Sequence, residues 1–114
     1  MPEIILTTPV AAPIHRCFDL SRSIDLHKIS TVHTGEEAIA GRTSGLIGIG
    51  EQVTWRARHL AVWQTLTSRI TAYKRPYYFV DEMVQGIFAG FRHEHTFEEK
   101  DGVTLMHDRF SYTS

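Results

Sequence analysis

The chain has 114 residues and a net charge of −1, with 42% apolar and 22% charged residues. This length supports one hydrophobic core, so we expect residues 1–114 to form a single domain. The basic residues are dispersed, which argues against nucleic acid as a partner. No apolar run approaches the roughly 20 residues of a membrane span. Cys17 is the only cysteine, which predicts a reducing compartment, the cytoplasm.

The N-terminal third is expected to combine one strand with short helices. Glu3–Thr8 is rich in β-branched residues and is predicted to form the first strand. A helix is expected to begin after Pro13, which the first helical turn tolerates, and Ser23 is expected to cap a second helix. Thr34–Glu37 matches a capping box, which predicts a third short helix that ends at Gly41.

The remainder of the chain alternates apolar and polar residues, as antiparallel strands do. Gly45–Gly50 leads into it and is interpreted as a flexible connection, because its glycine spacing fits no phosphate-binding fingerprint. With the first strand, five further strands predict an α+β domain, a six-stranded antiparallel sheet of order 1-6-5-4-3-2. These five are expected over Val53–His59, Val62–Tyr73, Tyr77–Val84, Phe88–Glu99 and Val103–Tyr112.

The dipeptide Asp101-Gly102 sets the register of the last two strands. It is preferred in two-residue hairpin turns with positive φ. Counting outward from this turn predicts five cross-strand pairs: Lys100 with Val103, Phe97 with Met106, His95 with Asp108, His93 with Phe110 and Phe91 with Tyr112. Because strand side chains alternate between faces, the last four pairs share one face, and we expect it to be concave.

This face and its neighbours supply the candidate ligand-binding residues. Core packing is the favoured role of any single aromatic residue or methionine among them. Asp81 and Met83 can face either way, because a one-residue slip at the Gln85-Gly86 turn reverses both. The candidates are Trp55, His59, Phe79, Met83, Phe91, His93, His95, Phe97, Met106, Asp108 and Phe110, and Tyr112 extends the same wall.

His93, His95 and Asp108 form the polar centre of this face. The favoured interpretation is that Asp108 orients an imidazole by a hydrogen bond, in a structural or ligand-orienting role. Metal binding is one alternative, because alternate strand positions present both imidazoles together. Acid–base catalysis is the other. We assign no metal and no cofactor from the sequence, and no nucleophile elbow is present.

Four segments resemble bacterial members of the START-like, helix-grip (SRPBCC) superfamily: Val53–His59, Arg75–Met83, Phe91–Phe97 and Thr104–Asp108. The resemblance extends over essentially the whole chain. It implies a curved antiparallel sheet that grips a long C-terminal helix, with a hydrophobic cavity between them. Members of this superfamily bind lipids, sterols, polyketides or other apolar molecules, and some branches act as cyclases or hydrolases.

One departure from the superfamily concerns the C-terminus. The family pattern continues beyond Tyr112 into a helix of about two dozen residues, whereas this chain stops at Ser114. The concave face is therefore expected to lack its main cover, as a truncated product would. An exposed apolar face favours association in water, and we expect a homodimer that covers the open sheet.

The function favoured by these observations is the binding of a small hydrophobic ligand of the lipid, polyketide or aromatic type. A few polar groups among apolar walls are the usual composition of a ligand pocket. The first alternative is a cyclase- or hydrolase-like enzyme that uses His93, His95 and Asp108. The second is an oligomerising interaction protein. An open pocket at the His–Asp pair favours chemistry, whereas a sealed pair favours structure.

Overall fold

A computed structural model describes residues 2–31, 35–59, 61–86 and 90–113, and of residue 59 only the backbone. Two short helices follow the first strand, and six strands come after them. The elements are β1 (Glu3–Val10), α1 (Ile14–Ser21), α2 (Ile24–Ser30), β2 (Glu37–Gly41), β3 (Gln52–His59), β4 (Val62–Lys74), β5 (Tyr78–Gln85), β6 (Gly90–Lys100) and β7 (Val103–Thr113). Phe88 and Ala89, predicted to begin the β6 strand, lie outside the described residues.

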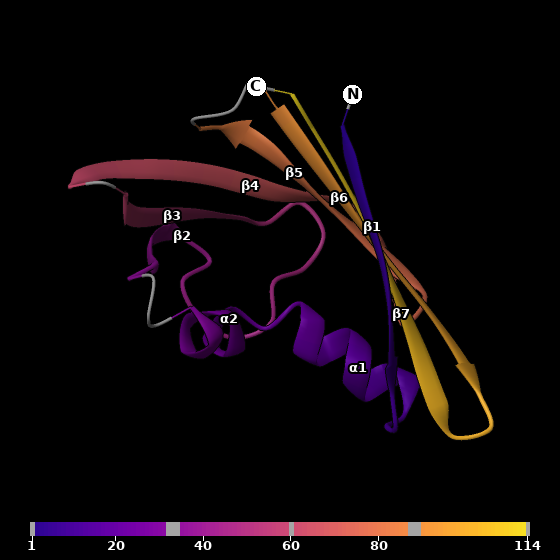
Figure 1. The fold of residues 1–114 in the computed structure, drawn as a ribbon. Coiled ribbons are helices and arrows are strands. Elements are labelled where there is room, and N and C mark those ends of the chain that lie inside the picture. Colours follow the sequence, from indigo (N-terminus) through magenta and orange to yellow (C-terminus); the bar gives the residue numbers. More distant parts are fainter. Residues whose placement is uncertain (1, 32–34, 60, 87–89, 114) are drawn as a thin grey trace.

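All the described strands belong to one antiparallel sheet with the order β1-β7-β6-β5-β4-β3-β2. Ile4 lies opposite Phe110, which confirms the predicted pairing of the first and last strands. The sheet is strongly bent: β2, β3 and β4 run at a steep angle to β5, β6, β7 and β1, and both helices lie on its inner side (Figure 1). The helices thus cover part of the concave face.

The prediction of a third helix ending at Gly41 is wrong, and so is the count of six strands. Glu37–Gly41 forms β2, the seventh strand, which pairs with β3. Across this pair of strands, Arg56 of β3 donates to the Glu37 carboxylate over 2.8 Å. A helix of so few residues forms too few hydrogen bonds to offset its nucleation, whereas a strand here completes a ladder. Thr34, the proposed cap, lies outside the described residues.

The first two helices agree with the prediction. α1 begins directly after Pro13 and presents Ile14, Cys17 and Phe18 as its buried face. The Glu99 carboxylate of β6 accepts from the backbone N–H of Ile14 over 2.9 Å, which satisfies an otherwise unpaired donor at the helix start. Ser23 caps α2 by accepting from the backbone N–H of Leu26 over 3.1 Å.

The β6–β7 hairpin also has the predicted register. Asp101 and Gly102 both adopt positive φ, 54° and 79°, and connect Lys100 to Val103. All the predicted cross-strand pairs are present, including His95 opposite Asp108 and Phe97 opposite Met106. The hairpin therefore presents these side chains on the face that we predicted.

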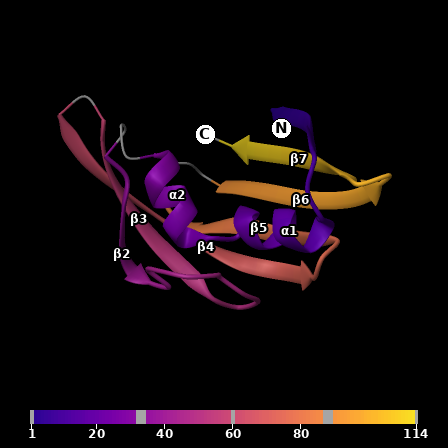
Figure 2. The same ribbon diagram turned by 90° about the horizontal axis from the view of Figure 1, so that it is seen from below.

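The core lies between α1 and the sheet, and Phe18 is at its centre. Its ring makes edge-to-face contacts with Tyr73, Phe79 and Phe97, with centroids 5.3–5.4 Å apart. α1 contacts β6 and β7, and the view from below shows it lying over the sheet, roughly along β5 and β6 (Figure 2). The core fills one end of the concave face, and the other end, beside α2, remains available for a site.

Candidate functional site

Two adjoining hollows lie on the concave side between α2 and the sheet. The outer hollow has a volume of about 360 Å³, and apolar side chains such as Trp55, Leu66 and Phe91 line much of it. The inner hollow has a volume of about 180 Å³ and reaches His93 and His95. The two share His27, Trp55, Ser68 and Asp81 in their walls. An apolar space thus leads to a polar end.

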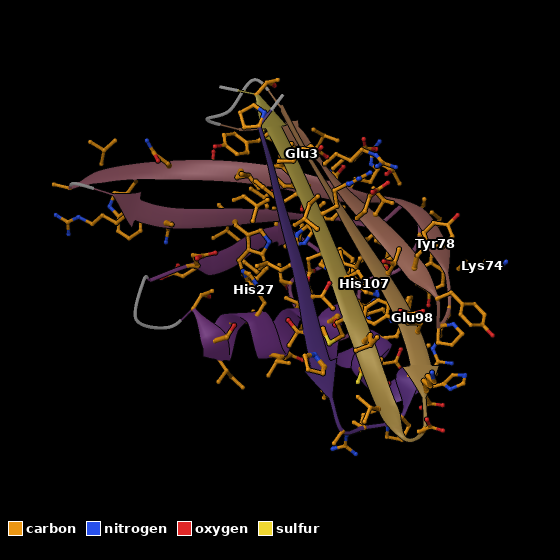
Figure 3. All side chains as sticks on the ribbon, turned by 45° about the vertical axis from the view of Figure 1, so that its right-hand side comes forward. Glu3, His27, Lys74, Tyr78, Glu98 and His107 are labelled. Carbon is orange, nitrogen blue, oxygen red and sulfur yellow. The ribbon has the colours of Figure 1, made fainter. Side chains whose placement is uncertain are left out.

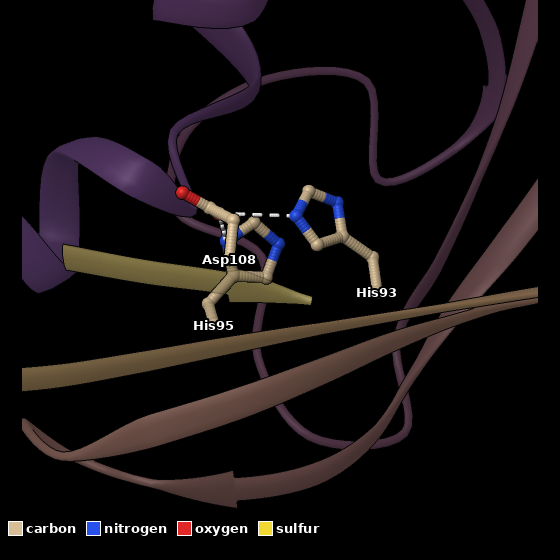
Figure 4. Close-up of side chains that lie close together, drawn as sticks. All are labelled: His93, His95 and Asp108. Carbon is tan, nitrogen blue, oxygen red and sulfur yellow. Dashed lines mark hydrogen bonds and ion pairs between the residues drawn. The ribbon is translucent and has the colours of Figure 1, made fainter. Parts of the chain in front are cut away.

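At the inner end, one oxygen of Asp108 lies close to two imidazoles. Asp108 Oδ1 is 3.0 Å from His93 Nε2 and 3.1 Å from His95 Nδ1 (Figure 4). The contact between His95 and Asp108 was predicted from the hairpin register and is confirmed. The contact of His93 is diagonal, because this residue lies directly opposite Phe110.

Stacked rings hold both imidazoles in place. His95 lies parallel to Phe79, with centroids 4.2 Å apart and an interplanar angle of 13°. His93 stacks on the other imidazole at 3.8 Å, and Phe110 presents its ring edge to His93 at 5.5 Å. This packing restricts the rotation of both rings, so their nitrogen atoms have defined directions.

Two pKa shifts set the charges of Asp108 and His95 at neutral pH. The hydrogen bonds from His93 and His95 hold the pKa of Asp108 well below its usual range, so this carboxylate is ionised. Burial lowers the pKa of His95, against the opposing effect of its bond to Asp108, so this imidazole is neutral. A neutral imidazole beside an ionised carboxylate can accept a proton or bind a metal ion.

Asp81 is a second carboxyl group in the hollows, and its orientation was left open by the sequence. It lies opposite His93 in the sheet and lines both hollows. Burial raises the pKa of Asp81, and a hydrogen bond from Ser68 opposes the shift. Met83, whose orientation was also open, lies opposite Ser68 in the sheet and therefore faces the concave side, but the hollow that it lines is a different one, shared with Phe91 and Arg92.

The structure places the predicted site residues in different surroundings. Trp55, Phe79, Phe91, His93 and His95 line the two hollows. Asp108 and Phe110 contact the imidazoles directly, and Tyr112 lies next in the aromatic row, 5.8 Å from Phe110. Phe97 belongs to the buried core instead, and Met106 packs against that core. The side chain of His59 lies outside the described part of the chain.

His27 is a site residue that the sequence reasoning missed. It lies on α2 and lines both hollows, and its ring contacts Trp55 at 4.4 Å while its Nε2 lies 3.2 Å from Glu36. Figure 3 shows it between α2 and the sheet. The available signal was its spacing: His27 follows the buried Ile24 by three residues and therefore shares its helix face.

No family model and no curated protein matches this chain. Solved structures do match it. Major latex-like protein 151 from Panax ginseng superimposes with a TM-score of 0.69 at 14% identity, over 98% of this chain and 78% of that one. Protein Ms6760 from Mycobacterium smegmatis superimposes with a TM-score of 0.67 at 19% identity, over 98% of this chain and 73% of that one. CalU16 from Micromonospora echinospora superimposes with a TM-score of 0.68 at 16% identity, over 98% of this chain and 61% of that one.

These structures confirm the predicted fold class, because the chain has the α+β, helix-grip, Bet v1-like architecture. At such low identity they show the fold alone, so membership of the START-like superfamily stays a prediction, as does the single domain. Of the two helices that the structure describes, neither is long and apolar enough to cross a bilayer.

Proposed function

We propose that this protein binds one small hydrophobic molecule, of the lipid, polyketide or aromatic type, in the two joined hollows of its concave face. The observation that carries the proposal is the outer hollow of about 360 Å³, whose lining surface is mostly apolar and which adjoins the more polar inner hollow. This volume lies within the roughly 300–1,000 Å³ that ligand pockets occupy.

The walls indicate which parts of a ligand each end accepts. Trp55, Leu66 and Phe91 offer apolar surface to a hydrocarbon or aromatic body. Ser68, Asp81 and His95 offer a few convergent polar groups at the inner end, where a hydroxyl or carbonyl group of the ligand would find partners. The resemblance to START-like proteins, which bind apolar molecules, supports the same conclusion.

Trp55 provides the test of this proposal. Replacing Trp55 by alanine should weaken the binding of an apolar fluorescent probe such as anilinonaphthalene sulfonate by about tenfold or more, because a buried aromatic contact of about 1.5–3 kcal/mol is removed. Trp63→Ala is the matched control, since Trp63 is 54% exposed and outside both hollows. It should change the affinity less than twofold.

Equal loss in both variants, or none in either, would contradict this assignment of the site. Trp55→Phe keeps an aromatic ring at this position and should retain most of the affinity for the fluorescent probe. It therefore separates the loss of the contact from a loss of folding. Native mass spectrometry of protein purified from its own cells would then identify a retained molecule directly.

We also propose that a second copy of the chain covers the open part of the sheet. Ile4 and Leu6 of β1 pair with Phe110 and Asp108, so they lie on the concave side, yet Leu6 is 58% exposed. β1 is also an edge of the sheet, and an exposed apolar edge favours pairing with another chain.

Light scattering after size exclusion checks this arrangement. The wild type should have the mass of a dimer, and Leu6→Lys should shift it towards the monomer, because a charge buried in an apolar contact is costly. Ile5→Lys is the control: Ile5 is 62% exposed but alternates to the other face. A wild type that is monomeric at all concentrations would refute the dimer.

A further inference from the structure

We propose that His93, His95 and Asp108 bind one divalent transition-metal ion of the zinc type at the inner end of the site. One ligand atom from each of the three residues lies within 4.8 Å of the other two. Among the residues that the structure describes, no other set of three histidine, cysteine or acidic side chains meets this criterion. The inference concerns a metal and goes beyond the binding of an apolar molecule.

The two distances from Asp108 to the imidazole nitrogens are close to those that a metal requires. Bonds of 2.0–2.1 Å at tetrahedral angles separate neighbouring ligand atoms by about 3.4 Å. His93 Nε2 and His95 Nδ1 lie 3.0 and 3.1 Å from Asp108 Oδ1. For both nitrogens to bind an ion, each neutral imidazole would carry its proton on the other ring nitrogen, and these two distances would lengthen by a few tenths of an ångström.

The donor set selects the class of ion. Two imidazole nitrogens and one carboxylate oxygen suit zinc and related transition metals, whereas calcium and magnesium prefer oxygen ligands alone. Three protein ligands leave a fourth position open, as in zinc sites that hold a water or substrate oxygen. The imidazoles line the inner hollow, where Asp81 and Ser68 lie nearby to bond such an oxygen.

The surroundings prepare the three residues for a metal. Stacking between Phe79 and His95, and between the two imidazoles, fixes the directions of the rings before any ion arrives.

The experiment is a metal titration of untagged, chelator-treated protein. Zn²⁺ affinity is measured by competition with a chromogenic chelator, and Co²⁺ is followed by its visible absorption, which is strong in tetrahedral sites. We expect one ion per chain. His93→Gln and Asp108→Asn should each weaken Zn²⁺ binding by at least about tenfold, the lower end of the loss seen even for outer-shell changes. Both should also abolish the tetrahedral Co²⁺ spectrum.

His107→Gln is the matched control. His107 lies next to Asp108 on β7 but on the other face, where it contacts Glu98 and Thr7, and Figure 3 marks it with Glu98. This variant should bind Zn²⁺ as the wild type does. A wild type that binds neither ion, or a loss in the control equal to that in His93→Gln, would overturn the inference. The fluorescent-probe assay on metal-free protein tests the proposed function separately, so the failure of one is distinguishable from the failure of the other.

Discussion

Replacing Phe18 by alanine is expected to lower the free energy of unfolding by about 3–5 kcal/mol, which is the usual cost of removing a fully buried phenylalanine. Phe18 is completely buried and is the residue of α1 that joins the helix to the sheet. Its ring contacts Tyr73, Phe79 and Phe97, so the truncation leaves a cavity bordered by three aromatic rings. Urea denaturation followed by circular dichroism measures the change.

Leu20→Ala is the control for this experiment. Leu20 lies on the same helix but is exposed, so its truncation should change the free energy of unfolding by no more than about 0.5 kcal/mol. Phe18→Leu should fall between the two, because it fills part of the cavity. A loss below about 1 kcal/mol for Phe18→Ala would contradict the packing of α1 against the sheet.

The second large effect concerns Asp108. Asp108→Ala should lower the free energy of unfolding by roughly 1–3 kcal/mol, because His93 and His95 both lose their partner in a partly buried place. His107→Ala, on the outer face of the same strand, should cost less than about 0.5 kcal/mol. If Asp108→Ala lowers the free energy of unfolding as little as the control does, the contacts of Asp108 with His93 and His95 do not stabilise the fold.

The same group predicts how stability depends on pH. The pKa of Asp108 is lower in the folded state, so its stabilising effect is complete above the ordinary carboxyl pKa of about 3.9 and disappears as the pH falls. The pKa of His95 is also lowered on folding. The unfolded chain therefore takes up this proton first, and stability falls as the pH drops below about 6.5. Both shifts destabilise the fold in acid.

Two variants separate these contributions. His95→Gln should remove the part of the slope that begins near pH 6.5, and Asp108→Asn should flatten the slope at lower pH. Asp19, whose pKa is lowered to about 2 by Arg75 and Arg22, acts in the same acid range and remains in both variants. Urea midpoints between pH 3 and 8 check the prediction, and a slope below pH 5 unchanged in Asp108→Asn would contradict it.

The sequence by itself determined the features of this protein that depend on local patterns. The Asp101-Gly102 turn, together with period-two alternation, was enough for the register of β6 and β7 and hence for the contact between His95 and Asp108. It worked because a two-residue turn leaves one way to pair the flanking strands. The Ser23 cap could also be predicted from the sequence, since a capping side chain bonds a backbone N–H only three residues away.

Only the tertiary structure decided the features that depend on distant partners. Glu37–Gly41 carries a local helix signal, yet it is a strand because β3 offers it a ladder and Arg56 an ion pair. His27 reaches Trp55 because α2 packs against β2, the neighbour of β3, and the sequence of α2 does not indicate that partner. His93 joins Asp108 diagonally across the hairpin, through the reach of its Nε2. The face of each side chain follows from alternation, but its neighbours follow from how a bent sheet brings separate strands together.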